Sequence, residues 1–66
     1  MIRFTNPSMT ERQAAEKFAA TFWEKPRQIG AWEHRNGRLV FQLIDGVKWY
    51  QVILLPKIGW EITDAE

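Results

Sequence analysis

The chain has 66 residues, enough for one small domain, and a domain of this size buries only about 60% of the surface that it exposes when unfolded. A composition of 45% hydrophobic and 26% charged residues excludes a disordered chain, and the absence of cysteine excludes disulfides as a source of stability. The net charge of +1 gives no overall attraction to nucleic acid or to an anionic membrane, and no apolar run is long enough for a signal peptide or a membrane span, so we expect a cytoplasmic protein.

A helix over about residues 10–25 is the first element that the sequence predicts. Ser8 with Glu11, and Thr10 with Gln13, both have the spacing of a capping box, in which each side chain accepts a hydrogen bond from the backbone of the other residue. Pro26 is expected to end the helix, because proline disfavours the helical conformation of the residue before it. At 100° per residue the apolar side chains gather on one face, which we expect to be buried. That face carries Ala14, Ala15, Phe18, Ala19 and Phe22.

After the helix the apolar period changes to two, which is typical of strands. Asn36-Gly37 and Asp45-Gly46 are the two strongest signals for two-residue hairpin turns. The sequence therefore predicts an α+β fold in a single domain of residues 1–66, with one N-terminal helix packed on an antiparallel meander of three to four strands. Whether Ile2 to Phe4 adds an edge strand stays open. The predicted strands cover about residues 28–35, 38–44, 47–55 and 60–63.

The two hairpin turns also predict which residues face one another across the strands. They pair Trp32 with Phe41, Phe41 with Tyr50, and Gln42 with Trp49. Two sheet faces follow from these pairs, and the helix is expected on the face that is more uniformly apolar at its centre. That face carries Phe41, Leu43, Tyr50 and Val52, with Phe18 and Phe22 of the helix filling the gap.

The second face of the predicted sheet is also rich in apolar residues. Pairing Leu55 with Trp60 places the last strand so that Trp60 and Ile62 point to this side. One helix covers only one face, and the remaining patch exceeds what monomers usually leave bare. We expect it to contact another protein, first of all a second copy in a homodimer; the alternative is that strand twisting or a bulge buries it within the monomer. The predicted interface consists of Trp49, Trp60, Val40, Gln42, Gln51, Ile53 and Ile62. The aliphatic residues expected around it are Ile29, Ile44, Val47 and Leu55.

The same face allows a second hypothesis, a small nucleic-acid-binding protein. Trp49 and Trp60 would stack on unpaired bases, and Arg35 and Arg38 would hold phosphates. Arg35 faces Arg38 across the turn, and such a like-charged pair repels unless an anion or a carboxylate lies with it. Glu33, two residues away on the same face, is the simpler source of that carboxylate. The near-zero net charge also weakens the nucleic-acid hypothesis.

Catalytic residues are few. His34 has no partner that spacing can identify, and Glu33 and Glu61 carry ordinary surface charge without a defined separation. One histidine and no cysteine leave nothing to hold a metal ion. We therefore expect a non-enzymatic binding or regulatory protein with no cofactor, no metal and no membrane contact.

Overall fold

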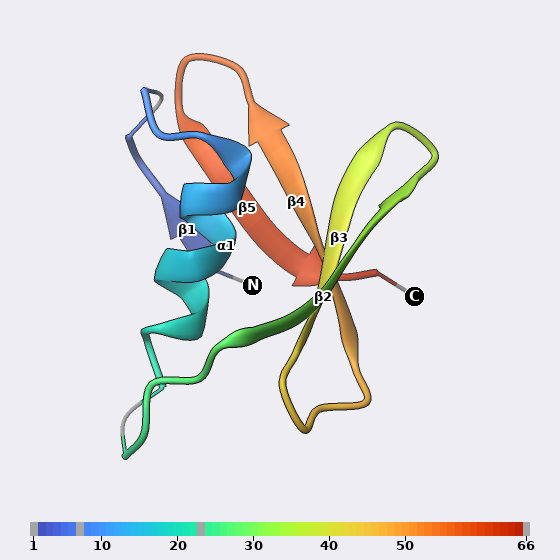
Figure 1. Ribbon diagram of the computed structural model, residues 1–66. Helices are drawn as coiled ribbons and strands as arrows, with labels where there is room; N and C mark the ends of the chain where they lie inside the picture. The colour runs from blue at the N-terminus through green and yellow to red at the C-terminus, as the bar shows by residue number, and fades with distance from the viewer. Residues whose placement is uncertain (1, 7, 23, 66) are drawn as a thin grey trace.

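The computed structural model of the chain describes residues 2–6, 8–22 and 24–65; Trp23, which falls within the predicted helix, lies outside them. It confirms the α+β class: helix α1 lies on one side of a five-stranded antiparallel sheet of order β1-β5-β4-β3-β2 (Figure 1). The strand beyond the three or four predicted is β1, the alternative that the sequence left open. The elements are β1 (Ile2–Phe4), α1 (Glu11–Ala19), β2 (Ile29–Arg35), β3 (Arg38–Leu43), β4 (Trp49–Leu55) and β5 (Gly59–Asp64).

The start of α1 is as predicted. Thr10 is the cap residue, the backbone N–H of Gln13 donates to Thr10 Oγ1 over 3.1 Å, and the backbone N–H of Thr10 donates to Gln13 Oε1 over 2.9 Å. Two amide groups that a helix start leaves unpaired are satisfied in this way. The predicted apolar face is buried against the sheet, and its fully buried members are Ala14, Ala15, Phe18 and Ala19.

The end of α1 is not as predicted, because the helix ends at Ala19 rather than at Lys25. Thr21 donates from Oγ1 to the carbonyl oxygen of Phe18 over 2.6 Å, and the backbone N–H of Arg27 donates to the carbonyl oxygen of Ala19 over 2.9 Å. These bonds satisfy carbonyl groups at the helix end without a further helical turn. The chain can therefore leave the helix early and turn back toward the sheet.

The register of the central strands is confirmed. Trp32 pairs with Phe41, Phe41 with Tyr50, and Gln42 with Trp49. Asn36 and Gly37 both have positive φ, of 51° and 77°, as the predicted two-residue turn requires. The turn at Asn36-Gly37 therefore accounts for the pairing of β2 with β3.

A β-bulge at Gly30 changes the start of β2. Ile29 pairs with Leu43 and Ala31 pairs with Gln42, which leaves Gly30 as an extra residue on β2. Ile29 therefore lies on the helix side with Leu43, and the prediction that placed Ile29 on the second face is wrong. A side chain at Gly30 would lie 3.0 Å from the Cα of Ile44, so the close approach of two backbones favours glycine at the bulge.

The β3–β4 connection is a longer loop than the predicted two-residue turn. The backbone N–H of Gly46 donates to the carbonyl oxygen of Leu43 over 2.9 Å, and Asp45 has a φ of 61°, so the chain turns one residue earlier. Ile44 and Val47 are consequently loop residues, 49% and 91% exposed. The prediction that placed Ile44 and Val47 on the second sheet face is wrong.

The β4–β5 register differs from the prediction by one residue. Leu55 pairs with Gly59 instead of Trp60, and a slip of one residue turns every side chain of β5 to the opposite face. Trp60 and Ile62 therefore lie on the helix side. The loop between the strands is one residue shorter than predicted: the backbone N–H of Ile58 donates to the carbonyl oxygen of Leu55 over 3.0 Å, and Lys57 and Gly59 have positive φ, of 66° and 144°. A Cβ at Gly59 would lie 1.9 Å from the carbonyl oxygen of Phe4, so glycine at this place also lets β1 approach β5.

The core lies between α1 and the sheet, where it was predicted. The Phe18 ring lies 4.9 Å from Tyr50, 5.8 Å from Phe41 and 5.7 Å from Phe22, measured between ring centroids. Phe41 is completely buried. The aliphatic part of the core comes from Leu43, Val52 and Ile62.

The junction between β3 and β4 is short. It has three aligned pairs, the last of them Val40 with Gln51, whereas β2–β3 and β4–β5 have six each. Beyond this last pair the two strands spread apart, as Figure 1 shows for the β2–β3 hairpin and the upper end of β4.

Candidate functional site

The sheet face opposite α1, called the open face below, brings together most of the predicted interface. Alternation along the strands places these residues on it, and no element of the described part of the chain packs over them. Trp49 is half-buried, and Val40 is buried although it lies on this side. The predicted interface residues at the centre of the open face are Val40, Gln42, Trp49, Gln51 and Ile53.

Trp60 and Ile62 are absent from the open face. Ile62 is 1% exposed and belongs to the core. Trp60 is half-buried, packs against the core and donates from Nε1 to the carbonyl oxygen of Met9 over 2.7 Å. The indole thus fixes the segment before α1 to β5. This removes Trp60 from the predicted protein interface and from the predicted nucleic-acid surface.

Arg35 and Trp49 form a stack across the open face. The guanidinium carbon of Arg35 lies 4.7 Å from the centroid of the Trp49 ring, and Arg35 Nε donates to the Glu33 carboxylate. The register places Val40, on β3, between Arg35 on β2 and Trp49 on β4. The stack therefore lies over Val40, which accounts for the 2% exposure of that side chain. Stacking of this kind contributes about 0.5–1 kcal/mol at exposed sites.

Arg38 belongs to a second series of hydrogen-bonded polar groups on the open face. Its Nη1 donates to Gln51 Oε1 over 3.2 Å, and Gln51 Nε2 donates to the carbonyl oxygen of Asp64 over 2.9 Å. Because the amide nitrogen of Gln51 is committed to Asp64, its oxygen faces Arg38. Among the described ion pairs none involves Arg38, and its described side-chain partner is the neutral amide of Gln51.

Sequence reasoning missed the ion pair at the other end of this face. Arg3 Nε lies 3.0 Å from Glu61 Oε2, and the two residues pair across β1 and β5. The alternation of Ile2, Arg3 and Phe4 was the available signal. It did not show that β1 adds to β5, since three residues do not determine a partner strand.

Catalytic and metal-binding groups do not converge in the described part of the chain. His34 is exposed and pairs with Leu39 in the β2–β3 ladder. No group of three or more histidine, aspartate and glutamate side chains is close enough to hold a metal ion among the described residues. Within the same residues, every buried side-chain nitrogen and oxygen has a hydrogen-bond partner.

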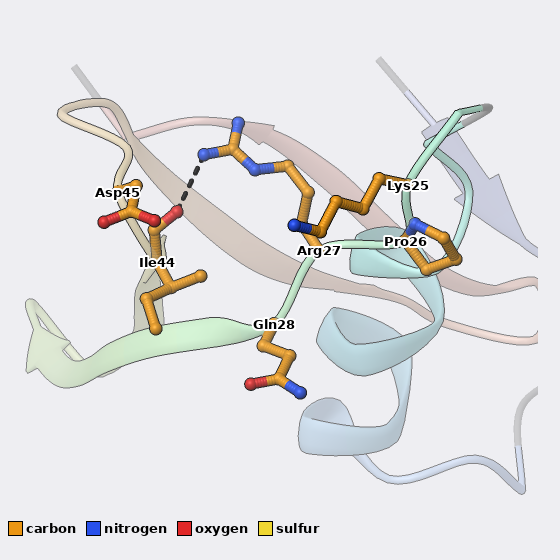
Figure 2. A pocket seen from close by; sticks show the side chains of 6 residues that line it. All are labelled: Lys25, Pro26, Arg27, Gln28, Ile44 and Asp45. Atoms are coloured by element: carbon orange, nitrogen blue, oxygen red, sulfur yellow. Dashed lines mark hydrogen bonds between the residues drawn. The ribbon is translucent and has the colours of Figure 1, made fainter.

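A cavity of about 530 Å³ lies between the segment after α1 and the β3–β4 loop (Figure 2). Two hydrogen bonds hold these segments together. Arg27 Nη2 donates to the carbonyl oxygen of Ile44 over 2.7 Å, and the backbone N–H of Ile44 donates to the carbonyl oxygen of Gln28 over 2.8 Å. Lys25 and Asp45 bring opposite charges to the lining. The cavity therefore has no single charge preference, and Arg27 already has a structural role.

The comparisons with known proteins identify no relative of this chain. No protein-family model, curated protein or solved structure was found to match the chain. As for the membrane, α1 is too short and too polar to cross a bilayer, and the described residues contain no other candidate span.

Proposed function

We propose that this chain is a small binding protein without enzymatic activity, which contacts a protein partner, first of all a second copy of itself, through the open face. The observation that carries the proposal is that α1 covers only one side of the sheet. Trp49, Ile53 and Leu55 lie half-buried on the other side, with no described element over them. Apolar side chains in this position favour a partner that removes them from water.

The arrangement of charges supports a protein as the partner. The pairs Arg3–Glu61 and Glu33–Arg35 lie toward opposite edges of the open face, and the apolar side chains lie between them. An apolar centre within a polar rim is the usual anatomy of a protein interface. Tryptophan and arginine, here joined in the stack of Arg35 on Trp49, are also the residue types that contribute most to binding energy in such interfaces.

The shape of the chain agrees with a contact between two copies. Its extents along the three principal axes are 33 × 28 × 17 Å, so the molecule is flatter in one direction than in the other two. A side of these dimensions can supply the about 800 Å² that each partner of a standard interface buries. A two-fold axis would let one patch serve both copies. Burial of this kind would also stabilise a domain that has no disulfide.

Single-stranded nucleic acid is the second candidate for the open face. The observation that favours it is the guanidinium of Arg35 on the Trp49 ring, with Arg38 directly across the strand. Such a platform can stack on a base while a neighbouring arginine meets a phosphate. Glu33 and Glu61 on the same face, together with the net charge of +1, weaken the electrostatic attraction on which nucleic-acid binding depends.

The mass of the chain in solution, measured by sedimentation over a wide concentration range, tests the homodimer. Ile53→Lys and Leu54→Lys form a matched pair, because the two residues are neighbours on β4 and point to opposite sides. We expect Ile53→Lys to raise the dimer dissociation constant at least tenfold and Leu54→Lys to leave it unchanged. A wild-type chain that stays monomeric at millimolar concentration refutes the homodimer. Equal effects of the two variants refute the open face as its interface.

Trp49→Ala separates the two candidate functions. We expect this variant to keep its fold, measured by circular dichroism, and to lose assembly. Titration with single-stranded oligonucleotides at two salt concentrations tests the alternative. Binding that weakens steeply with salt and is lost in Trp49→Ala would favour nucleic acid, whereas no change in tryptophan fluorescence would exclude it. The cytoplasmic location stays a prediction.

A further inference from the structure

A small hollow on the open face is lined by hydrogen-bond donors. Its volume is about 220 Å³, and Arg35, Asn36, Arg38 and Gln51 contribute polar side chains to its lining, with Val40 below them. No carboxylate is among its lining residues in the described part of the chain. This concentration of donors distinguishes the hollow from the larger cavity of Figure 2, where Asp45 lies among the cations.

The turn places two positive charges at the hollow. Asn36 and Gly37 form the two-residue turn, so Arg35 and Arg38 are direct partners across the strands. Like charges in this arrangement repel one another. Glu33 offsets the charge of Arg35, but the described carboxylates form no ion pair with Arg38. Among the described residues, Arg38 therefore brings to the hollow a positive charge that is not in an ion pair.

Both guanidinium groups are held in place and keep unused donors. Arg35 is fixed by stacking on Trp49 and by the bond from its Nε to Glu33, and Arg38 is fixed by the bond from Nη1 to Gln51. A guanidinium has five N–H donors, and each of these two uses one of them in the described hydrogen bonds. Planar groups fixed in this way are suited to an oxyanion, because their donors form parallel bonds to its oxygen atoms.

We propose that this hollow binds one oxyanion group. The proposed function gives its source: the group is the carboxylate of an acidic side chain on the protein that covers the open face. Only the source of the oxyanion rests on the proposed function. Anion binding itself can be measured on the isolated chain, whether or not the chain assembles. The site also explains why a like-charged pair lies beside a surface that is otherwise apolar or internally paired.

The test is a titration with sodium acetate and with sodium phosphate at constant ionic strength, with chloride as the reference anion. The side-chain Nε–H signals of the arginines are followed by nuclear magnetic resonance. We expect saturable shifts of the Arg35 and Arg38 signals for both oxyanions, and a loss of saturation in Arg38→Gln. The control is Arg12→Gln, since the guanidinium carbon of Arg12 also lies 4.7 Å from a tryptophan centroid, that of Trp32, but without an arginine partner across a turn.

Shifts that do not saturate, or that chloride reproduces, overturn the oxyanion site. An equal response in Arg38→Gln and the wild type also overturns it, and the protein spectrum shows whether each variant is folded. The mass of the assembly, measured as a function of concentration, tests whether the oxyanion is a carboxylate of the partner. A tenfold rise of the dissociation constant in Arg38→Gln supports a carboxylate from the partner, and an unchanged constant overturns that source. A monomeric wild-type chain that binds acetate refutes the homodimer and leaves the oxyanion site standing.

Discussion

Replacing Gly59 by alanine tests the close backbone contact between β1 and the start of β5. The substitution places a Cβ 1.9 Å from the carbonyl oxygen of Phe4, so β1 must move away. Gly59 also has a φ of 144°, a region in which a side chain costs about 1–3 kcal/mol. Moving β1 exposes the half-buried side chains of Ile2 and Phe4, at about 1 kcal/mol each, scaled from the value for full burial. The expected loss of unfolding free energy is therefore about 3–5 kcal/mol, a large part of what a small domain has.

Gly37→Ala is the matched control for this prediction. Gly37 also has a positive φ, of 77°, but nothing lies within 4 Å of a Cβ built on it. Its expected cost is about 1 kcal/mol, which is the conformational part alone. Urea unfolding followed by tryptophan fluorescence measures both variants, and hydrogen exchange of the β1 amides shows whether that strand has moved. Equal losses in the two variants, or protected β1 amides in Gly59→Ala, would refute the role of the Phe4 contact.

Two further substitutions test the core and the helix start. Phe41→Ala should cost about 3–5 kcal/mol and leave little folded protein, because it empties a completely buried position; a loss below about 1 kcal/mol in urea unfolding would contradict this. Thr10→Ala should cost about 1 kcal/mol, because it removes the hydroxyl that accepts from the Gln13 amide, and an unchanged thermal midpoint by circular dichroism would speak against the cap.

The sequence predicts correctly those parts of the fold that depend on residues close together along the chain. Thr10 and Gln13 predict the start of α1, since a capping box needs only residues close in sequence. Asn36-Gly37 predicts the β2–β3 register, because two residues at positive φ suit a two-residue turn. Asp45-Gly46 gives the correct β3–β4 register even though the turn itself lies one residue earlier.

Contacts between distant segments account for what the sequence did not predict. Gly59 closes a loop that is one residue shorter than predicted, which turns Trp60 to the helix side, and the backbone of Phe4 lies against this glycine. Gly30 likewise becomes a bulge only because the backbone of Ile44 lies close to it. The candidate site was therefore predicted correctly on β3 and β4, whose register is as predicted, and wrongly on β5, where the loop after Leu55 is one residue shorter than predicted.

The three-pair junction of β3 and β4 joins two parts of the sheet, each built around a ladder of six pairs. One is the β2–β3 hairpin, and the other is the sheet of β4, β5 and β1. Local opening in proteins tends to follow the boundaries of such units, and here few backbone bonds cross the boundary. Phe18 contacts Phe41 on one unit and Tyr50 on the other. The two halves of the sheet are therefore joined by the Phe18 ring and by the stack of Phe41 on Tyr50, whose centroids lie 5.5 Å apart, as well as by the strand pairing between them.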